Sequence, residues 1–341
     1  MNILLTGGAG YIGSHTAVLL LNAGHQVFIV DNFCNSHLSI ISSIKKITGE
    51  TLICIDGDVR DTDLLIGLLK ANKIEAVIHF AGLKSVGESS KNPLEYYANN
   101  VQGTISLLQA MQECGVDKMV FSSSATVYGD PQYLPIDEAH PTAPTNPYGT
   151  TKLQIERILQ DVCKADKNLR IANLRYFNPV GAHESGLIGE NPRGIPNNLM
   201  PFISKVAAGQ QRSLSVYGDD YPTPDGTGVR DYIHVMDLAQ GHLSALNFLK
   251  KNEGMSTFNL GTGSGHSVLE LMKAFEDQSG KKIPFKITPR RTGDIASCYA
   301  NVEKAKVVLN WSPQYSLDEM CASAWKWQQS VNFKTNEDEI N

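Results

Sequence analysis

Short, uninterrupted apolar runs alternate with longer amphipathic stretches through the first half of this 341-residue chain. The runs are rich in Val, Ile and Leu and do not alternate with polar residues, which is typical of strands buried on both faces of a parallel sheet. We expect strands at residues 2–6, 26–31, 51–58, 76–82, 118–124 and 169–178, and helices between them at 12–23, 61–71, 99–114 and 148–163. This alternation predicts an α/β fold built on a doubly wound, parallel Rossmann sheet.

The regular alternation ends after residue 178. Residues 179–228 are rich in Gly, Pro and Asn, and only 199–209 has the pattern of a short helix. Farther along we expect a helix at 235–250, a strand at 257–260, a helix at 268–279 and an amphipathic helix at 317–331. These elements predict a smaller, mixed α/β lobe over the carboxyl edge of the sheet, where open α/β sheets bind their ligands.

Charge and cysteine content exclude several kinds of partner. The chain has 30 Lys and Arg residues against 35 Asp and Glu residues, a formal net charge of -5, so we expect no nucleic-acid partner. Its six cysteines form no Cys-x-x-Cys pair, which argues against a zinc site or a disulfide framework, and we expect no metal. No apolar run reaches the ~18 residues of a membrane span, and no signal-peptide pattern opens the chain. We therefore expect a cytoplasmic protein without a membrane partner.

A glycine pattern follows the first expected strand and opens the first expected helix. The sequence TGGAGYIG, at residues 6–13, contains Gly7, Gly10 and Gly13. In dinucleotide-binding proteins the first such glycine permits a tight turn, the second lets the backbone approach a pyrophosphate, and the third allows close contact between helix and strand. The helix N-terminus then attracts the phosphates. A plain glycine-rich turn is the alternative explanation of the same pattern.

Two acidic residues extend this pattern. Asp31 ends the second expected strand, where a carboxylate can bond the adenosine ribose 2′-hydroxyl and repel a 2′-phosphate. Because no Arg or Lys follows at residues 32–36, the predicted cofactor is NAD rather than NADP. Asp58 ends the third expected strand and is placed to reach the adenine amino group, with Val59 beside it. The alternatives are a turn-forming role for Asp31 and a helix cap at Asp58.

Tyr148 and Lys152 lie one helical turn apart at the start of an expected helix, so that both side chains project from one face. An ammonium near a phenol favours the phenolate, so we expect Lys152 to lower the pKa of Tyr148 from ~10 toward neutrality, where it can exchange a proton with a substrate hydroxyl. Ser124 ends the fifth expected strand on the same edge, where it can bond the same substrate oxygen. A Tyr-x-x-x-Lys pair alone is a weak signal, because it also arises by chance.

Several motifs together resemble the extended short-chain dehydrogenase/reductase superfamily. They are TGGAGYIG with Asp31, FAGLK at 80–84, SSSATVYG at 122–129, PYGTTK at 147–152 and RYFNPVGA at 175–182. Within that superfamily, the segments YGDDYPTPDGTGVRDYIHV at 217–235 and RRTGD at 290–294 resemble the UDP-glucose 4-epimerase family. The resemblance runs from residue 1 to residue 327, essentially the whole chain.

The resemblance implies an activity and a division of labour. The activity is reversible C4 epimerisation of UDP-hexoses by transient oxidation to a 4-keto sugar, with NAD held firmly throughout. Tyr148 would take the proton of the sugar 4-hydroxyl, Lys152 would tune Tyr148 and bond the nicotinamide ribose, and Ser124 would polarise the sugar oxygen. The resemblance also implies an NAD-binding Rossmann domain at 1–178 plus about 233–254, and a UDP-sugar-binding lobe at 179–232 and 255–341.

By matching position, the resemblance assigns two binding surfaces. The cofactor surface comprises Gly7, Gly10, Tyr11, Ile12, Gly13, Asp31, Asn32, Asn35, Ser36, Asp58, Val59, Phe80, Ala81, Gly82, Lys84, Asn99, Tyr148, Lys152 and Phe177. Asn99 is expected to begin its helix, where its alternative role is a cap. The UDP-sugar surface comprises Ser124, Tyr148, Asn178, Asn198, Leu199, Tyr217, Arg230, Arg291, Asp294 and Cys298. In it, Arg230 and Arg291 would bind the diphosphate, Tyr217 would stack on uracil, and Asp294 would hold the uridine ribose.

A homodimer is also implied, formed through the helices at 99–114 and 148–163. The apolar positions of these helices include Leu107, Leu108, Ile155 and Leu159. The same positions could equally belong to the core of one chain, and their spacing does not decide between the two.

Cys298 bears on the choice of sugar. It lies four residues after Asp294, where family members restricted to UDP-glucose and UDP-galactose carry a bulky tyrosine and members that also accept N-acetylated sugars carry a small residue. The resemblance therefore implies a dual-specificity enzyme that also interconverts UDP-GlcNAc and UDP-GalNAc. The alternative is a one-residue shift of register, in which Tyr299 takes the place of that tyrosine.

Two related reactions and one non-enzymatic role are the alternatives. A nucleotide-sugar 4,6-dehydratase needs an acid-base carboxylate pair, and such relatives carry Asp-Glu directly after the serine or threonine, whereas Ala125 and Thr126 follow Ser124 here. A UDP-glucuronate decarboxylase is disfavoured by the epimerase-like segments. An NAD-binding module without catalysis would be expected to lack the Tyr or the Lys, and this chain has both.

Overall fold

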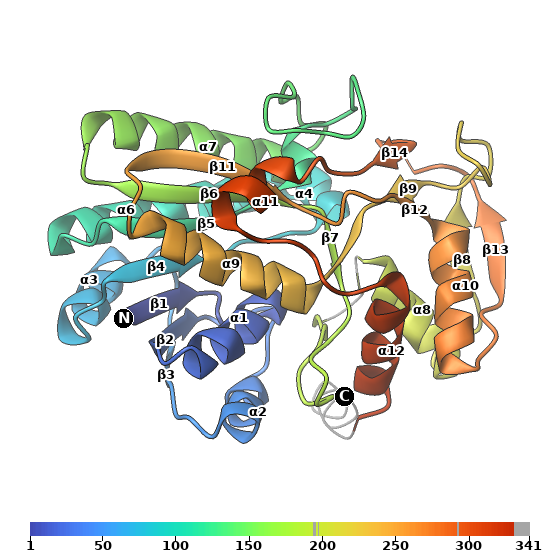
Figure 1. The fold of residues 1–341 in the computed structure, drawn as a ribbon, viewed down its shortest axis with the longest axis horizontal. Helices are drawn as coiled ribbons and strands as arrows, with labels where there is room; N and C mark the ends of the chain where they lie inside the picture. Colours follow the sequence, from blue (N-terminus) through green and yellow to red (C-terminus); the bar gives the residue numbers. More distant parts are fainter. Residues whose placement is uncertain (194–195, 197, 292, 331–341) are drawn as a thin grey trace.

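The computed structural model describes residues 1–193, 196, 198–291 and 293–330. A seven-stranded sheet forms its centre, with the order β11-β6-β5-β4-β1-β2-β3 and every neighbouring pair parallel (Figure 1). The strands are β1 (Asn2–Thr6), β2 (Gln26–Asp31), β3 (Ile53–Asp56), β4 (Ala76–His79), β5 (Lys118–Ser124), β6 (Arg170–Tyr176) and β11 (Gly254–Leu260). The strand order reverses direction between β1 and β4, so the expected doubly wound parallel sheet is confirmed.

Helices cover both faces of this sheet, because successive side chains of a strand point to opposite faces. Ile3 and Leu5 lie in one buried apolar cluster with residues of α1, α2, α9 and α11, whereas Leu4 lies in a second cluster with residues of α3, α6 and α7. These helices are α1 (Tyr11–Asn22), α2 (Ser39–Thr48), α3 (Thr62–Ala71), α6 (Gln102–Cys114), α7 (Pro147–Ala165), α9 (Val235–Leu249) and α11 (Glu303–Leu309). Both faces of the sheet are therefore removed from water.

Small sheets and further helices form the smaller lobe, which lies to the right of the large sheet in Figure 1. Its sheets pair β10 (Tyr232–His234) with β7 (Asn178–Val180), β9 (Val229–Arg230) with β12 (His266–Ser267) and β14 (Ser297–Cys298), and β13 (Phe285–Thr288) with β8 (Leu214–Tyr217). Helices α8 (Leu199–Ala207), α10 (Val268–Ser279) and α12 (Leu317–Gln328) contribute to one apolar cluster that includes Ile203, Leu271 and Phe275.

The predicted lobe includes β11 and α11, but the structure places both against the large sheet. We expected the lobe to resume at residue 255, but β11 pairs with β6 along its whole length, from Gly254 opposite Arg170 to Leu260 opposite Tyr176. Phe258 and Leu260 point into the core cluster of the large sheet. The strand therefore belongs to the Rossmann sheet, where it covers an edge that β6 would otherwise expose. The rest of the division into two domains stays a prediction.

We expected a helix to begin at Asn99, but the structure shows no helix start there. The helical path starts earlier, with α4 (Val86–Lys91) and α5 (Pro93–Tyr96), and passes through a π-helical turn at Tyr97–Val101 directly into α6. Pro93 occupies the first turn of α5, which suits a helix start. Asn99 thus lies inside a widened turn rather than at a cap. Single π turns of this kind are frequent at functional sites.

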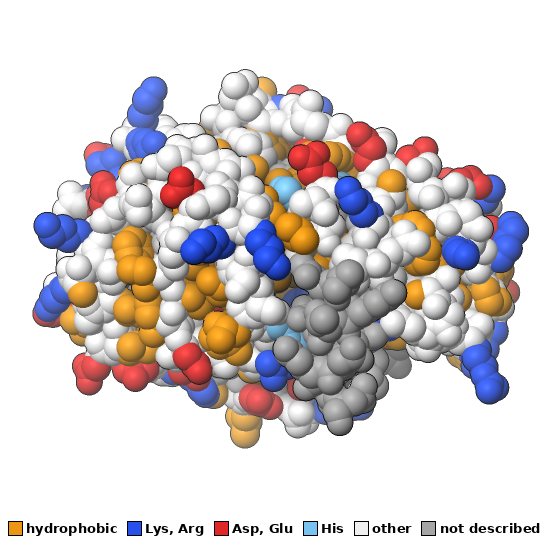
Figure 2. Space-filling view, turned by 90° about the horizontal axis from the view of Figure 1, so that it is seen from below, with side chains coloured by type: hydrophobic (Ala, Val, Ile, Leu, Met, Phe, Trp, Pro, Cys, Tyr) orange, Lys and Arg blue, Asp and Glu red, His pale blue; other side chains and the backbone are white. Residues whose placement is uncertain are grey.

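The four apolar positions on the expected dimer helices lie in the core of this chain. Leu107, Leu108, Ile155 and Leu159 are each at most 9% exposed and belong to the cluster beneath α6 and α7. They are therefore core residues, and the homodimer stays a prediction. In the part of the chain that the structure describes, no helix has the length and hydropathy needed to span a bilayer. The face shown in Figure 2 carries basic, acidic and apolar side chains intermixed.

Candidate active site

The predicted cofactor residues follow the carboxyl ends of parallel strands and therefore meet at one edge of the sheet. The glycine loop follows β1, Asp31 ends β2 and precedes Asn32, Asn35 and Ser36, and Asp58 and Val59 follow β3. Phe80, Ala81, Gly82 and Lys84 follow β4, Tyr148 and Lys152 lie in the first turns of α7 after β5, and Phe177 follows β6. The predicted cofactor residues thus lie at the ends of neighbouring strands along one edge of the sheet.

The glycine loop leaves no room for side chains at two of its three glycines. Gly7 has a φ of 68°, and a Cβ there would lie 2.7 Å from the backbone nitrogen of Ala81. A Cβ at Gly13 would lie 2.7 Å from the carbonyl oxygen of Gly7. Gly10 precedes α1, and no side chain of the described residues caps that helix, so its first amides remain suited to an anion. The loop therefore fits a dinucleotide diphosphate.

Asp31 and Asp58 are fixed by different contacts. The Asp31 carboxylate accepts hydrogen bonds from the backbone of Ala9 at 3.0 Å and the hydroxyl of Ser36 at 2.9 Å, which ties the end of β2 to the glycine loop. Asp58 accepts from the Arg60 guanidinium at 2.9 and 2.6 Å, and this contact lowers the pKa of the Asp58 carboxyl. Asp61, not Asp58, caps α3, so the alternative interpretation of Asp58 as a cap is wrong.

Glu190 connects the two binding surfaces and was missed by the sequence analysis. Its Oε1 lies 3.1 Å from the Lys84 ammonium and accepts a hydrogen bond of 2.6 Å from the Asn198 side chain. The Glu190 side chain is 8% exposed, and its charge raises the pKa of Tyr11, after the larger effect of burial. Lys84 comes from the predicted cofactor surface and Asn198 from the predicted nucleotide surface. A single carboxylate therefore links them, and no local sequence motif indicates it.

Asn100 also contributes to the site and was missed. It is 1% exposed, and its side chain accepts from the Leu83 backbone at 2.7 Å and donates to the Leu83 carbonyl at 3.0 Å and the Thr151 hydroxyl at 3.1 Å. A Cβ at Gly82 would lie 3.2 Å from the Asn100 side-chain oxygen and 3.7 Å from Lys152 Nζ. Asn100 therefore holds the chain after β4 against α7. The adjacent Asn99 was the only sequence signal near it.

Local structure brings Ser124, Tyr148 and Lys152 to the same edge. Asn146 caps α7 by accepting from the Gly149 backbone at 2.9 Å, and Pro147 occupies the first turn, which starts the helix just before Tyr148. Ser124 ends β5, and its hydroxyl accepts from the backbone and the hydroxyl of Thr126 at 3.2 and 2.9 Å in a short 3-10 turn (Ala125–Val127). The candidate catalytic groups thus come from β5 and the helix that follows it.

The pKa of Tyr148 differs from the sequence-based expectation. Burial raises the pKa of the Tyr148 phenol, and the hydrogen bond with Ser124 opposes this only in part. Lys152 is 4% exposed and donates to the Ser122 carbonyl at 2.7 Å, and burial lowers its pKa to about 8. The ammonium is thus directed at a backbone oxygen, and the predicted lowering of the Tyr148 pKa is wrong for this arrangement. Desolvation of the phenol outweighs the effect of its position beside a lysine.

A buried ion pair braces the strand and the helix that carry these groups. Arg175 of β6 donates to both oxygens of Glu156 of α7, at 3.0 and 2.6 Å, and the Ser123 hydroxyl donates to Glu156 at 2.5 Å. Arg175 also donates to the Tyr128 hydroxyl at 3.0 Å, which in turn donates to Asn259 of β11 at 2.6 Å. Every charge in this network has a partner, as buried charges require. The network therefore fixes α7 against three strands beneath the catalytic groups.

The predicted nucleotide residues come from the smaller lobe and from the start of β7. Asn178 opens β7, Asn198 precedes Leu199 at the start of α8, Tyr217 ends β8, Arg230 lies in β9, and Arg291 and Asp294 lie between β13 and β14. The Arg291 guanidinium lies 3.8 Å from the centroid of the Tyr217 ring. Arg230 is opposite Cys298 in the β9–β14 pair. The structure thus joins these residues in pairs, and their roles toward a nucleotide stay predictions.

Cys298 points into a buried cluster, and its neighbour does not. Cys298 is 8% exposed and packs in a cluster with Val127 and Phe177, the latter from the predicted cofactor surface. Tyr299 follows the last residue of β14, and a Cβ on Gly265 would lie 3.0 Å from its ring. Consecutive residues of an extended strand point in opposite directions, so the two side chains cannot exchange places without a shift of the whole strand.

The described residues contain no group of three or more His, Cys, Asp or Glu side chains arranged to hold a metal ion.

Comparisons with known proteins identify the family. The chain matches the family described as GDP-mannose 4,6 dehydratase over residues 4–324. The UDP-glucose 4-epimerase of Bacillus subtilis is 56% identical over 330 residues, which cover 97% of this chain and 97% of that protein. The crystal structure of UDP-glucose 4-epimerase from Bifidobacterium longum in complex with NAD+ and UDP has a TM-score of 0.95 and 53% identity, covering 98% of this chain and 100% of that one.

A second solved structure agrees with the first. UDP-glucose-4-epimerase from Stenotrophomonas maltophila, with bound NAD and formylated UDP-arabinopyranose, has a TM-score of 0.95 and 53% identity, covering 96% of this chain and 98% of that one. More than half of the residues are thus identical over nearly the full length of each of these epimerases. This chain therefore belongs to the UDP-glucose 4-epimerase family of enzymes.

Proposed function

We propose that this enzyme interconverts UDP-glucose and UDP-galactose by inverting C4 of the hexose, with NAD held at the glycine loop. The observation that carries the proposal is the placement of Ser124, Tyr148 and Lys152 on the sheet edge that also holds the glycine loop. Related epimerases bind NAD together with UDP or a UDP-sugar. When bound, NAD supplies a hydride acceptor during oxidation and a hydride donor during the return step.

Residues of this chain transfer the proton of the sugar 4-hydroxyl and orient the sugar. Tyr148, once it is a phenolate, would take the proton of the 4-hydroxyl while the C4 hydride passes to the bound NAD, so that the sugar loses two electrons and becomes a ketone. Ser124 donates a hydrogen bond to the same oxygen and holds it beside the phenol. After the sugar presents its other face, the hydride returns to C4 and Tyr148 gives the proton back. Lys152 provides positive charge beneath this exchange and stabilises the phenolate while it exists.

The structure supports epimerisation over elimination. A 4,6-dehydratase needs a carboxyl acid near C5 and C6, but Ala125 and Thr126 follow Ser124, and the Thr126 hydroxyl bonds to Ser124 itself. Glu156, a carboxylate of α7, is held by Arg175 and Ser123 inside the core. The decarboxylase and the non-catalytic module are disfavoured by the full-length similarity to epimerases and by the retained Tyr and Lys.

We also propose that the active site accepts N-acetylated sugars, so that UDP-GlcNAc and UDP-GalNAc interconvert as well. Cys298 supports this, because its thiol is smaller than the tyrosine that the resemblance places at this position in the enzymes restricted to UDP-glucose and UDP-galactose. The ring of Tyr299 lies against Gly265, whereas Cys298 packs with Phe177, which disfavours the shifted register. We further propose that the enzyme works as a homodimer in the cytoplasm. Size-exclusion chromatography with light scattering tests the dimer directly.

Incubation of the purified enzyme with UDP-glucose, without added NAD, is expected to yield UDP-galactose. A parallel incubation with UDP-GlcNAc is expected to yield UDP-GalNAc, if Cys298 acts as the small residue at this position does in enzymes that also accept N-acetylated sugars. Chromatography that resolves the 4-epimers measures both conversions. Conversion of UDP-glucose alone would contradict the dual specificity and leave the epimerase proposal standing. If neither sugar is converted after NAD is added, the epimerase proposal is wrong.

The Cys298→Tyr variant is expected to separate the two activities. The phenol ring enlarges a side chain inside a packed cluster next to the sugar, so turnover of UDP-GlcNAc should fall by about 100-fold, corresponding to ~2.7 kcal/mol. Turnover of UDP-glucose should change by less than about fivefold, because its C2 carries only a hydroxyl. Cys298→Ala is the matched control and should retain both activities. Equal losses on the two substrates in Cys298→Tyr would show that Cys298 does not control sugar choice.

A further inference from the structure

Two chain segments that carry proposed nucleotide ligands are paired at two separated places. They first run in parallel as β8 and β13, where Tyr217 is opposite Thr288, and they meet again as β9 and β14, where Arg230 is opposite Cys298. Between these pairings the loops at 218–228 and 289–296 leave the strand pattern. Arg291 and Asp294 lie in the second loop. The relative placement of the nucleotide ligands therefore depends on what joins the loops between their paired ends.

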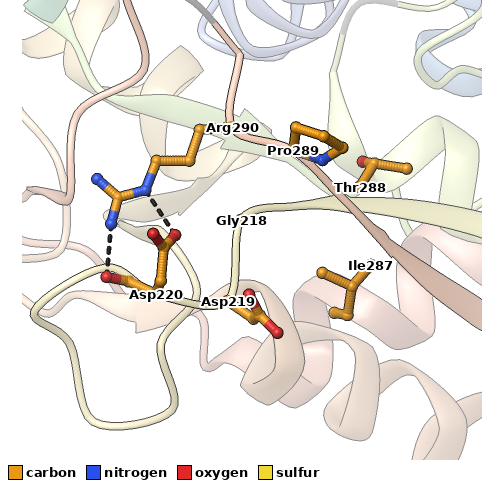
Figure 3. A pocket seen from close by; sticks show the side chains of 7 residues that line it. All are labelled: Gly218, Asp219, Asp220, Ile287, Thr288, Pro289 and Arg290. Carbon is orange, nitrogen blue, oxygen red and sulfur yellow. Dashed lines mark hydrogen bonds and ion pairs between the residues drawn. The ribbon is translucent and has the colours of Figure 1, made fainter.

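Arg290 makes that connection. Its Nε donates to the Asp220 carboxylate at 2.7 Å and its Nη2 donates to the Asp220 carbonyl oxygen, both drawn in Figure 3. The guanidinium also lies 4.0 Å from the centroid of the Tyr221 ring. A Cβ at Gly218, whose φ is 83°, would lie 2.7 Å from that ring and 2.8 Å from the Arg290 side chain. One side chain thus binds the first loop by charge, by a backbone hydrogen bond and by stacking.

The exposure of this contact argues against a role in global stability. The Arg290 side chain is 42% exposed and that of Asp220 is 71% exposed, and ion pairs on the surface contribute little to folding. A cavity of about 390 Å³ opens beside the pair, lined by both residues with Gly218, Asp219, Ile287, Thr288 and Pro289 (Figure 3). The contact therefore matters for how the two loops are held, more than for whether the chain folds.

Arg290 and its neighbour Arg291 each lie over a tyrosine ring of the other segment. Arg291 follows Arg290 directly and lies over the Tyr217 ring at 3.8 Å, while Arg290 lies over the Tyr221 ring. Consecutive arginines thus contact two tyrosines, one at the end of β8 and one in the loop that follows it. Tyr221 is 6% exposed, and among the described residues its hydroxyl has no hydrogen-bond partner. The ring of Tyr221, rather than its hydroxyl, is therefore the part that Arg290 uses.

We propose that Arg290 is a positioning residue for the nucleotide diphosphate, acting through Asp220 and Tyr221 to fix the loop that leads into β9, and so Arg230, against the loop that carries Arg291. This inference rests on the proposed UDP-sugar specificity. The guanidinium of Arg290 is bound to Asp220 and stacked on Tyr221, so Arg290 organises the site, and Arg230 and Arg291 bind the diphosphate. Preorganised loops lose less conformational entropy when a ligand binds, which appears as tighter binding without a faster chemical step.

Calorimetric titration of the holoenzyme with UDP, together with steady-state kinetics on UDP-glucose, tests the proposal. Arg290→Gln is expected to raise the Kd for UDP and the KM for UDP-glucose by about tenfold and to leave kcat within about twofold. Asp220→Asn should have a smaller effect in the same direction, and the double variant should be no worse than Arg290→Gln alone, since both act through one contact. Tyr221→Phe should resemble the wild type, whereas Tyr221→Ala should resemble Arg290→Gln.

Arg212→Gln is the matched control, because it removes another exposed arginine of the same lobe. It is expected to leave Kd, KM and kcat unchanged. An unaltered Kd for UDP in Arg290→Gln, or a loss confined to kcat, would overturn the inference. A wild-type enzyme that does not bind UDP would refute the proposed function itself, and with it this inference.

Discussion

Tyr148→Phe is expected to lower the rate of C4 epimerisation by at least about 1,000-fold, because general acid-base transfer accounts for roughly 100-fold to 10,000-fold of a rate and no second phenol replaces it. The ring of phenylalanine preserves the packing at the start of α7, and Asn146 and Pro147 still fix that helix start. The cofactor content of the purified variant and its Kd for UDP should therefore equal those of the wild type. Chromatographic separation of the UDP-hexoses measures the rate.

Tyr133→Phe is the matched control for the loss of a phenol. Its hydroxyl donates to the Asp137 carboxylate at 2.8 Å on the surface, and the residue is 43% exposed. This variant is expected to have wild-type activity. If Tyr148→Phe retained a rate within about tenfold of the wild type, Tyr148 would not be the proton-transfer group, and Ser124 would become the residue to test next.

The pH dependence of the rate follows from the same site. Burial raises the pKa of Tyr148, so the phenol is protonated at neutral pH in the structure described here. Only the phenolate can take the proton of the 4-hydroxyl, so the phenol must lose its own proton before oxidation begins, and the rate is expected to rise with pH below the pKa of Tyr148. Lys152, with a pKa lowered by burial to about 8, gains charge as pH falls through that value. Its positive charge is thus available throughout the neutral range.

The sequence predicted the sheet well because its signals are local. Each continuous apolar run from residue 2 to residue 176 became a strand, since a strand buried on both faces needs apolar side chains at every position. The position of β11 was predicted wrongly because its signal is not local. Residues 254–256 do not form an apolar run, and only the parallel pairing with β6, more than 80 residues earlier in the chain, shows that the strand belongs to the large sheet. Pairing partners of this kind cannot be read from one segment.

The site was predicted where motifs are contiguous and missed where contacts are distant. The glycine loop and Tyr148 with Lys152 each occupy fewer than ten consecutive residues. Glu190 touches Lys84, 106 positions away, and Arg290 touches Asp220, 70 positions away. The same limit explains the pKa of Tyr148. A motif shows that a lysine lies one turn away, but only the three-dimensional structure shows that burial dominates and that Lys152 faces Ser122.

Acid is expected to unfold this protein well before its carboxylates are neutralised, because four histidines are buried in their neutral form. His15, His79, His234 and His242 are each at most 2% exposed. Burial lowers the pKa of His15 and His79 to about 3 and that of His234 and His242 to about 4. In the unfolded chain these histidines have pKa values near 6.5, so between about pH 6.5 and pH 4 they bind protons that they do not bind in the folded chain. The contribution of these four histidines to the free energy of unfolding is therefore fully present above pH ~6.5 and is lost as pH falls toward 4.

Hydrogen bonds explain why two of these rings must stay neutral. The His15 Nε2 accepts a hydrogen bond of 3.1 Å from the backbone nitrogen of His183. The His234 Nδ1 accepts one of 3.0 Å from the backbone nitrogen of Met236 and so caps α9. A protonated imidazole has no acceptor nitrogen, so each bond is broken when the ring gains a proton. Protonation thus adds the loss of a cap to the cost of burying a charge.

The size of the effect follows from linkage. At about pH 5, each histidine costs ~2 kcal/mol relative to neutral pH, or roughly 8 kcal/mol for the four. Asp231 and Asp237 oppose this, because burial raises the pKa of both carboxyls, that of Asp237 to about 6, and protonation of Asp237 in the folded state returns on the order of 1 kcal/mol at the same pH. The net loss is comparable with the whole stability of a typical domain, which is about 5 to 15 kcal/mol. We therefore expect the midpoint of thermal unfolding to fall by at least about 10 °C between neutral pH and pH 5.

His234→Asn provides the decisive comparison. Asparagine can still accept from the Met236 backbone as a helix cap, but it cannot gain a proton. The variant should therefore keep the cap and lose about a quarter of the acid sensitivity, seen as a shallower slope of unfolding free energy against pH below ~6.5. Circular dichroism across a pH series measures that slope for both proteins. An unchanged slope in His234→Asn would mean that this ring does not resist protonation, and the acid sensitivity would have to arise from the other three histidines.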